Sequence, residues 1–540
     1  MRFSIQPALS RALAGATLAL GLVACGGSDS SFEVNTASGA VSGNETATSY
    51  SYLGIPYAAP PVGSLRWRAP AAAAPWSGTR SGANYAPHCA QPASPFGSVS
   101  TSEDCLYLNV YTPKGNGPYP VMVWIHGGAF YLGLSNAFDP SALVAKGVIV
   151  VTINYRLGAL GFMSHSALST EQGGSSGNYG LMDQQAALRW VRSNIANFGG
   201  NANNITIVGE SAGGFSVHSH VASAGSAGLF HKAISMSGAY PFGAPQDSLA
   251  VAQAKGAGVA TAVAAATSTT ACTTVDCLRA LPVSALLAAQ AIAYPSGPVP
   301  SVDGSVLTAN VRTTIAAGTH NRVPMIEGTT RDEWRLFVAL DEFTAAPLAD
   351  NAAHIAKVTA LLGGSLNPAA GPTATALVNG LYSTPSIYPD ASVAYGALGT
   401  DMVFACNGRI AALELQQHAP VYAYEFRDRT APSTLPHRST FSMGAYHGSE
   451  LQYLFPTSSP LAAEQQALAG TMTTYWTNFM KTGNPNGTGV ATWAAFTAAA
   501  DGYQGLDITS GGGVAPLATN FAASHNCTAL NQGVPFTPTP

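Results

Sequence analysis

Ile205-Thr206-Ile207-Val208-Gly209-Glu210-Ser211-Ala212-Gly213 is the stretch that decides the fold. Its apolar run, Ile205 to Val208, predicts a buried strand, and the small residues that follow Ser211 predict a helix. Glycines two residues before and two residues after Ser211 allow the chain to turn sharply from strand to helix. Such a turn exposes the serine hydroxyl at the positive end of the helix dipole. The stretch therefore predicts a nucleophilic serine on a strand, turn and helix.

Other short apolar runs predict further buried parallel strands. They are Val121 to Ile125, Val148 to Val151, Val323 to Ile326 and Val421 to Phe426. From Asp183 to Phe198 the apolar residues step by three or four positions, as on one face of a helix. Strands that alternate with helices predict an α/β fold around a large, mostly parallel sheet. We find no internal repeat and no linker between domains, so residues 32–540 are expected to form a single domain.

The composition limits the class of protein. The chain has 540 residues, of which 47% are hydrophobic and only 9% are charged, and its formal net charge is −4. This length and apolar content suffice for a large core and argue against extensive disorder. No run of lysine or arginine provides the positive surface that a phosphate backbone requires. The composition therefore excludes nucleic acid as a partner.

Residues 1–24 have the pattern of an export signal, with two arginines before an apolar stretch too short to span a bilayer permanently. The stretch ends in Leu22-Val23-Ala24-Cys25, which resembles the bacterial lipobox, in which the cysteine thiol carries diacylglycerol. Gly26 is not the aspartate that resembles an inner-membrane retention signal, which favours the outer membrane of a Gram-negative bacterium. Residues 25–31 would then be a flexible tether, and membrane contact is expected only through this anchor. The alternative is an ordinary signal with an incidental Cys25, and a periplasmic or secreted protein.

The remaining six cysteines form an even set, as expected in an oxidising compartment. Proximity in the sequence suggests that Cys89 pairs with Cys105 and Cys272 with Cys277, which leaves Cys406 with Cys527. Six cysteines allow fifteen pairings, so this assignment needs support beyond their number.

A glycine-containing loop follows the apolar run that ends at Ile125. It reads His126-Gly127-Gly128-Ala129-Phe130. Small residues at such a point allow several backbone N–H groups to point at one oxygen of a substrate. The tetrahedral oxyanion formed by attack of a serine needs donors of this kind. The loop therefore predicts an oxyanion hole, although by itself it could be an ordinary glycine turn.

A serine nucleophile also needs a base to accept its proton and an acid to orient that base. In α/β-hydrolases the acid and then the histidine follow the serine along the chain. Asp332 and Glu333 form a carboxylate pair after a predicted strand, and on chemistry alone either could be the acid. His447, flanked by Gly448, lies in the last third of the chain, where this order requires the base.

The chain resembles the type-B carboxylesterases, a family that includes bacterial para-nitrobenzyl esterases and the cholinesterases. The likeness runs from about Phe32 to Cys527. The motifs that carry it, besides those already quoted, are Tyr52-Leu53-Gly54-Ile55-Pro56-Tyr57-Ala58, Ser102-Glu103-Asp104-Cys105-Leu106-Tyr107-Leu108-Asn109, Asn154-Tyr155-Arg156-Leu157-Gly158, Gly177-Asn178-Tyr179-Gly180-Leu181-Met182-Asp183-Gln184 and Phe198-Gly199-Gly200-Asn201.

The resemblance implies an α/β-hydrolase fold and a serine carboxylic ester hydrolase that works through an acyl-enzyme without a cofactor. It implies Ser211 as nucleophile, Glu333 rather than Asp332 as acid, and His447 as base. It further implies an oxyanion hole made by the N–H groups of Gly128, Ala129 and Ala212. It supports the pairs Cys89 with Cys105 and Cys406 with Cys527, and makes Cys272 with Cys277 the remaining pair.

The loop from Cys89 to Cys105 departs from the cholinesterase pattern. It encloses only fifteen residues and contains no tryptophan, which in cholinesterases binds quaternary ammonium. We therefore expect broad access for short-to-medium acyl or aryl esters, and not choline ester specificity. Polyesters, carbamates and bulky toxin esters are alternative substrates of the same site. An adhesion protein of this fold is the alternative from another class, but such members have lost the nucleophile that is present here.

Several further residues are open to two interpretations. Trp334 and Phe130 could line the substrate pocket, although core packing is favoured for both. Glu210, Glu450 and Ser237 resemble the family's secondary electrostatic network around the histidine, but could be structural. Finally, His218 and His220 lie two residues apart on the predicted helix after Ser211. They face different directions there, so no metal site is indicated, and the sequence does not reveal the oligomeric state.

Overall fold

A computed structural model describes residues 32–240, 246–294, 297–343, 345–361, 374–435 and 439–531. The predicted signal, the lipobox cysteine and the predicted tether therefore lie outside the described residues. By the contacts within the chain, one compact unit begins at Phe32.

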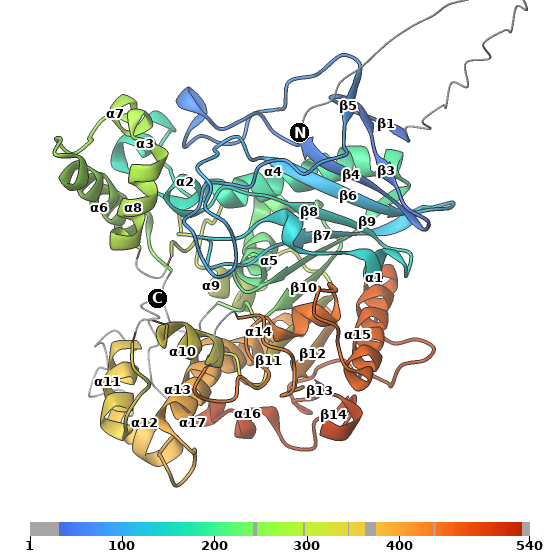
Figure 1. Cartoon of the computed structure of the whole chain (residues 1–540), viewed down its shortest axis with the longest axis vertical. Helices are drawn as coiled ribbons and strands as arrows, with labels where there is room; N and C mark the ends of the chain where they lie inside the picture. Colours follow the sequence, from blue (N-terminus) through green and yellow to red (C-terminus); the bar gives the residue numbers. More distant parts are fainter. Residues whose placement is uncertain are drawn as a thin grey trace, which may run out of the picture. The chain divides into compact units, whose positions relative to one another are not determined.

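The centre of this unit is an eleven-stranded sheet (Figure 1). The seven strands from β8 to β13 run parallel, and antiparallel strands lie at both edges. In spatial order the strands are β14 (Ala515–Pro516), β13 (Tyr503–Leu506), β12 (Val421–Phe426), β11 (Met325–Thr330), β10 (Lys232–Met236), β9 (Gly200–Glu210), β7 (Tyr119–Ile125), β8 (Ile149–Ile153), β6 (Tyr107–Pro113), β4 (Ser49–Pro56) and β3 (Asn44–Glu45). A smaller sheet holds β1 (Glu33–Thr36), β2 (Gly39–Ser42) and β5 (Thr79–Ser81). This is the predicted α/β architecture.

Both faces of the sheet are covered because alternate residues of each strand point to opposite sides. In β9, Ile205 and Ile207 pack into one apolar cluster, and Val208 packs into another. Helices of the first cluster are α4 (Tyr179–Asn194), α5 (Ala212–Ala222), α9 (Val311–Ala316) and α14 (Cys406–Leu415). The second cluster contains α1 (Ser141–Val144) and the long helix α15 (Ala463–Thr482). The core is therefore two layers, one on each side of the sheet.

The observed elements differ from the predicted ones at several boundaries. Strand β11 starts at Met325, two residues later than predicted, and continues through Thr329 and Thr330. It extends because these threonines pair with Glu425 and Phe426 of β12, and the apolar run alone did not indicate that pairing. Helix α4 starts before Asp183 and ends at Asn194, after which residues 195–198 form a 3-10 turn. The antiparallel strands before β7 were not predicted.

The alanine-rich stretch forms a small group of helices: α6 (Leu249–Thr267), α7 (Val275–Ala280) and α8 (Val283–Ala293). Among the described residues, α6 alone is long and apolar enough to match a membrane span, with a mean hydropathy of 1.3. Its residues Val259 and Val263 pack with Leu286 of α8 in an apolar cluster, and 33% of its apolar stretch is buried. The stretch is thus a structural excursion from the sheet, at the edge of the molecule labelled in Figure 1.

Three disulfides connect Cys89 to Cys105, Cys272 to Cys277 and Cys406 to Cys527. The last one joins two segments that are 121 residues apart, at the start of α14 and of α17 (Cys527–Asn531). Nearby, the buried His525 lies between Asp401 and Glu425, at 2.5 and 2.6 Å. Asp401 belongs to a short π-helix, Thr400–Ala405, that precedes α14. The C-terminal helices are therefore fixed by a covalent bond and by buried ion pairs.

Four more helices extend this part of the molecule. They are α10 (Arg335–Asp341), α11 (Asn351–Leu361), α12 (Ala374–Leu381) and α13 (Ala391–Gly399). They follow β11 in the chain and share an apolar cluster with the Cys406–Cys527 disulfide. The loop between β11 and α10 carries the candidate acid, so this cluster supports one side of the site.

Candidate active site

Ser211 occupies the single position between β9 and α5. Its backbone has φ +56° and ψ −125°, a conformation that L-residues rarely adopt. A Cβ at Gly209 would lie 2.4 Å from the backbone of Gly213, and a Cβ at Gly213 would lie 2.0 Å from the carbonyl oxygen of Ile125. Only glycine fits at both positions, so these two residues make the sharp turn possible. The Ser211 N–H donates to the carbonyl of Met236, at 2.9 Å, which fixes the turn to β10.

The His126-Gly127-Gly128-Ala129-Phe130 loop lies directly against this turn. A Cβ added at Gly127 would be 2.9 Å from the Cβ of Ser211. Gly128, Ala129 and Phe130 have φ values of +103°, +55° and +57°, which turns the backbone through three consecutive left-handed positions. The structure gives the N–H groups of Gly128, Ala129 and Ala212 no acceptor among the described residues. The loop thus combines an unusual backbone conformation with N–H groups that can donate hydrogen bonds to a ligand oxygen.

Glu333 and His447 are in direct contact, although they are 114 residues apart in the sequence. His447 Nδ1 lies 2.6 Å from Glu333 Oε2. The other oxygen, Oε1, accepts hydrogen bonds from the hydroxyls of Ser237 and Thr329, each at 2.6 Å, and from the N–H of Thr330 at 2.7 Å. Three donors on Oε1 leave Oε2 to the imidazole, so the carboxylate is held in one orientation.

The neighbouring Asp332 points elsewhere. It forms ion pairs with Arg335 at 2.9 Å and Arg429 at 2.8 Å, and accepts the N–H of Ala445 at 3.0 Å. These contacts join the loop after β11 to the loop that carries His447. Sequence chemistry left Asp332 and Glu333 as equal candidates for the acid, whereas the geometry brings only Glu333 to the histidine.

A second carboxylate reaches the other nitrogen of the imidazole. Glu210 Oε1, from the residue that precedes Ser211, lies 3.2 Å from His447 Nε2. Burial alone would lower the pKa of His447, but the charges of Glu210 and Glu333 outweigh burial and raise it. Burial would likewise raise the pKa of Glu333, but the contact with His447 and the hydroxyl donors lower it. Glu333 and His447 therefore favour a charged pair in the free protein.

The two remaining carboxyl groups behave differently from Glu333. Burial is the main reason that the pKa of Glu210 is raised, to about 7. Burial, followed by the negative charges of Glu210 and Glu333, raises the pKa of Glu450 well above its ordinary value. Glu450 is fully buried, and burial disfavours its charged form. The pKa shifts of the three acids therefore differ: the pKa of Glu333 is lowered, whereas those of Glu210 and Glu450 are raised.

Aromatic rings cover the imidazole of His447. Its ring centroid lies 4.7 Å from that of Phe404 and 5.3 Å from that of Phe337. Trp334 packs on Phe337 and belongs to the same aromatic group, while Phe130 is buried against Phe162. Core packing therefore describes Phe130, and Trp334 is connected to the histidine through Phe337 and Phe404. Phe404 was missed in the sequence, since it lies in the π-helix and no motif marks it.

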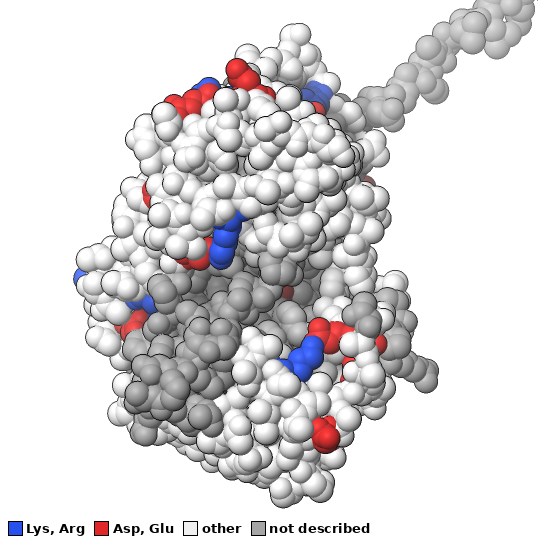
Figure 2. Space-filling model, turned by 90° about the vertical axis from the view of Figure 1, so that its left-hand side faces the viewer, with Lys and Arg blue, Asp and Glu red and all other residues white. Residues whose placement is uncertain are grey.

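Charged side chains are sparse on the face of the molecule that Figure 2 shows. Figure 2 shows the side of the molecule that carries α6 to α8, α11 and α12, and its surface is hollowed near the middle. Most side chains on this face are neither acidic nor basic, in agreement with a charged fraction of 9%.

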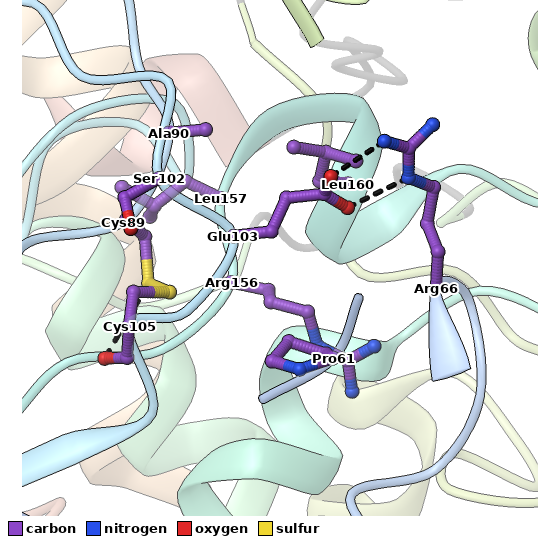
Figure 3. Close-up of a pocket in the computed structure, with 10 residues that line it drawn as sticks. All are labelled: Pro61, Arg66, Cys89, Ala90, Ser102, Glu103, Cys105, Arg156, Leu157 and Leu160. Atoms are coloured by element: carbon purple, nitrogen blue, oxygen red, sulfur yellow. Dashed lines mark hydrogen bonds and ion pairs between the residues drawn. A yellow bond between two sulfur atoms is a disulfide. The ribbon is translucent and has the colours of Figure 1, made fainter. Parts of the chain in front are cut away.

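A smaller hollow lies beside the Cys89–Cys105 disulfide (Figure 3). Two ion pairs stand next to it: Arg66 with Glu103, at 2.5 Å, and the buried Arg156 with Asp183, at 2.7 Å. Its free space is about that of one water molecule. Ser211, Glu333 and His447 do not line it, so it is separate from the candidate active site.

His218 and His220 have different partners, as their spacing predicted. His218 contacts Glu327 at 2.9 Å, and His220 contacts Gln184 and Ser226 at 2.8 and 2.9 Å. The described part of the chain contains no group of three or more His, Cys, Asp or Glu residues arranged to hold a metal ion.

Comparison with known proteins identifies relatives of this chain. The family model for the carboxylesterase family matches residues 30–522. A cocaine esterase of Oryctolagus cuniculus is 36% identical over 480 residues, which cover 83% of this chain and 86% of that protein. A fumonisin B1 esterase of Sphingopyxis macrogoltabida is 40% identical over 311 residues, which cover 56% of each chain.

Solved structures give the same result for the fold. A PNB esterase structure superposes with a TM-score of 0.75 at 32% identity, and the match covers 92% of this chain and 99% of that one. Its α/β-hydrolase fold is that of the mostly parallel sheet described above. The chain therefore belongs to the carboxylesterase family, and it is a carboxylic ester hydrolase.

Proposed function

We propose that Ser211, His447 and Glu333 hydrolyse esters through an acyl-enzyme. His447 accepts the proton of Ser211 while the serine oxygen attacks the ester carbonyl, and then delivers the proton to the departing alcohol. Water repeats the sequence in reverse and releases the acid. The observation that carries this proposal is the position of His447, which lies 2.6 Å from Glu333 and 3.2 Å from Glu210, the residue before Ser211 and its strained strand-to-helix turn.

In this mechanism the oxyanion binds to the N–H groups of Gly128, Ala129 and Ala212. Ala212 is the first residue of α5, so its N–H also lies at the positive end of a helix. The tetrahedral oxygen gains charge only as the bond forms. Donors that are already in place therefore stabilise the transition state more than the bound ester.

The substrates we propose are esters with short-to-medium acyl or aryl groups. The short disulfide loop without tryptophan and the weakly charged surface support broad access. Relatives are named for cocaine, pyrethroid and fumonisin B1 hydrolysis, which indicates that this site can accept dissimilar esters. Polyesters, carbamates and bulky toxin esters are alternative substrates, which a panel that includes polymer films would separate from small esters.

Replacement of Ser211 tests the nucleophile. We expect Ser211→Ala to lower kcat for para-nitrophenyl acetate and butyrate by about 10⁶, because no other group can form the acyl-enzyme. The wild type should also react covalently with a fluorophosphonate probe, and the variant should not. Turnover at the wild-type rate in folded Ser211→Ala would contradict the assignment. Absence of both probe labelling and turnover in the wild type would favour the non-catalytic alternative.

Adjacent carboxylates provide a matched test of the acid. Glu333→Gln should lower kcat by about 10⁴, since an amide favours the wrong tautomer of His447 and cannot stabilise its charged form. Asp332→Asn should instead lower the melting temperature, because it weakens the ion pairs with Arg335 and Arg429. Most of its turnover should remain. Steady-state kinetics on both folded variants distinguish the roles, and a larger loss of kcat in Asp332→Asn would reverse them.

The charge on Glu210 should set the pH profile. Hydrolysis needs neutral His447, so kcat/KM should rise with pH through a midpoint above the ordinary histidine value of 6.5. Glu210→Gln removes a carboxylate that raises the pKa of His447 and should move this midpoint to lower pH. Asp332→Asn is the control, since the carboxylate of Asp332 is paired with Arg335 and Arg429 and not with His447, so the midpoint should stay in place. Equal midpoints in the wild type and Glu210→Gln would contradict the argument.

We propose in addition that Cys25 carries a lipid that anchors the enzyme to the outer membrane, after removal of residues 1–24. The lipobox-like sequence supports this, and three disulfides fit folding outside the reducing cytoplasm. Cys25→Ser should move the protein from the membrane fraction to the soluble fraction. Unchanged partitioning of the variant would refute the anchor.

A further inference from the structure

The oxyanion loop, residues 126–133, contains a stretch of backbone in an unfavourable conformation. Gly128, Ala129 and Phe130 all have positive φ, and two of them carry a Cβ that disfavours this region. Such conformations persist only where surrounding contacts determine them. Within the loop, the N–H groups of Tyr131 and Leu132 both donate to the carbonyl of Gly128, at 2.9 and 2.8 Å. Contacts with residues outside the loop must therefore stabilise this conformation.

Phe130 is fixed by Gly158, whose N–H donates to the carbonyl of Phe130 at 2.8 Å. Gly133, three residues further along the chain, is fixed by a side chain. Gln91 Nε2 donates to the carbonyl of Gly133, and Gln91 Oε1 accepts the N–H of Gly133, both at 2.9 Å. The carboxamide thus pairs with this residue as a neighbouring strand would.

Gly133 packs directly against His126 and Gly127, the first residues of the oxyanion loop. A Cβ at Gly133 would lie 2.2 Å from Nδ1 of His126 and 2.6 Å from the carbonyl oxygen of Gly127. Gly127 in turn lies against Ser211, as described above. A shift of Gly133 would therefore displace the N–H groups that follow Gly127, relative to the serine.

Gln91 is itself held rigidly and shielded from water. It is fully buried, and its backbone exchanges two hydrogen bonds with Ser100, at 2.9 and 3.0 Å. Its Nε2 also donates to the carbonyl of Cys89, at 3.1 Å. Both contacts lie within the loop that the Cys89–Cys105 disulfide closes, beside the hollow of Figure 3. The disulfide loop therefore holds the carboxamide in place.

We propose that Gln91 is a positioning residue for ester hydrolysis, which holds the oxyanion loop in its strained conformation through Gly133. This inference rests on the proposed oxyanion hole. Gln91 does not touch the substrate; it keeps the N–H groups of Gly128 and Ala129 where the oxyanion forms. Loss of the carboxamide should reduce kcat and leave KM nearly unchanged, because the oxyanion exists only after substrate has bound.

Two substitutions separate positioning from simple stability. Gln91→Leu removes both hydrogen bonds to Gly133 and the one to Cys89. It should lower kcat for para-nitrophenyl butyrate about 10- to 100-fold, as small displacements of catalytic groups do. Gln91→Glu should depend on pH. A protonated carboxyl can accept from Gly133 N–H and donate to its carbonyl, whereas the ionised form cannot donate. Its kcat relative to wild type should therefore approach one at low pH and fall as pH rises.

Gln185→Glu is the matched control. Gln185 is also buried, and its Nε2 donates to the hydroxyls of Ser223 and Ser226, away from the oxyanion loop. The variant carries the same new carboxyl in a buried position, so its kcat relative to wild type should not vary with pH. Active sites are counted by fluorophosphonate labelling, so that kcat refers to folded enzyme only. Affinity for a trifluoromethyl ketone, whose serine adduct carries an oxyanion, should fall with kcat in the Gln91 variants.

Each result decides the question. If the Gln91 variants have wild-type kcat per active site, or if Gln91→Glu and Gln185→Glu share one pH dependence, the proposal is overturned. Should Gln91→Leu fail to fold, the pH series of Gln91→Glu alone gives the answer. Wild-type turnover in Ser211→Ala would instead show that the proposed mechanism fails, whatever the Gln91 variants do.

Discussion

The turn at Ser211 is the constraint on which the rest of the structure depends. A single residue, Ser211, reverses the chain between β9 and α5. This is possible only because Gly209 and Gly213 have no side chains, which allows Gly209 to pack against Gly213 and Gly213 against the carbonyl of Ile125. The turn therefore lies at the carboxyl ends of β7 and β9. Ser237, Glu333 and His447 follow β10, β11 and β12 in the chain. The loops after five neighbouring parallel strands therefore lie together at the carboxyl-terminal edge of the sheet. Ligands of open α/β sheets bind at this edge.

The electrostatics of the site follow from this crowding. One imidazole and three carboxyl groups are buried in the same region. Burial disfavours the charged form of each of them. The pKa of Glu333 is lowered because His447 and hydroxyl donors interact with its carboxylate, whereas burial and then the charges of Glu210 and Glu333 raise the pKa of Glu450. Glu210 lies between these cases and can respond to the charge of His447. The hydrogen bonds to Glu333 therefore hold in place the carboxylate that contacts His447, the proposed base.

Much of the site can be predicted from the sequence, because strand, turn and loop signals are local. Ser211, the glycine loop and the order of acid and histidine are of this kind. Asp332 and Glu333 could not be distinguished on chemistry, since the turn after β11 decides which one faces His447. The end of β11 was missed because its threonines are fixed by pairing with β12. Phe404 gave no signal, because a π-helix distant in sequence brings it to the imidazole.

The Cys89–Cys105 loop connects substrate access with the chemistry of the site. Its short length and lack of tryptophan suit an open mouth, and the same loop carries the buried Gln91 against Gly133. A longer loop could cover more of the substrate, but it would have to keep the positions of Cys89, Gln91 and Ser100 unchanged to hold the oxyanion loop. Variation in this loop should therefore be tolerated between Gln91 and Ser100 and opposed at Cys89, Gln91 and Ser100 themselves. Substrate range could change along one part of the loop while the other part preserves the geometry at Ser211.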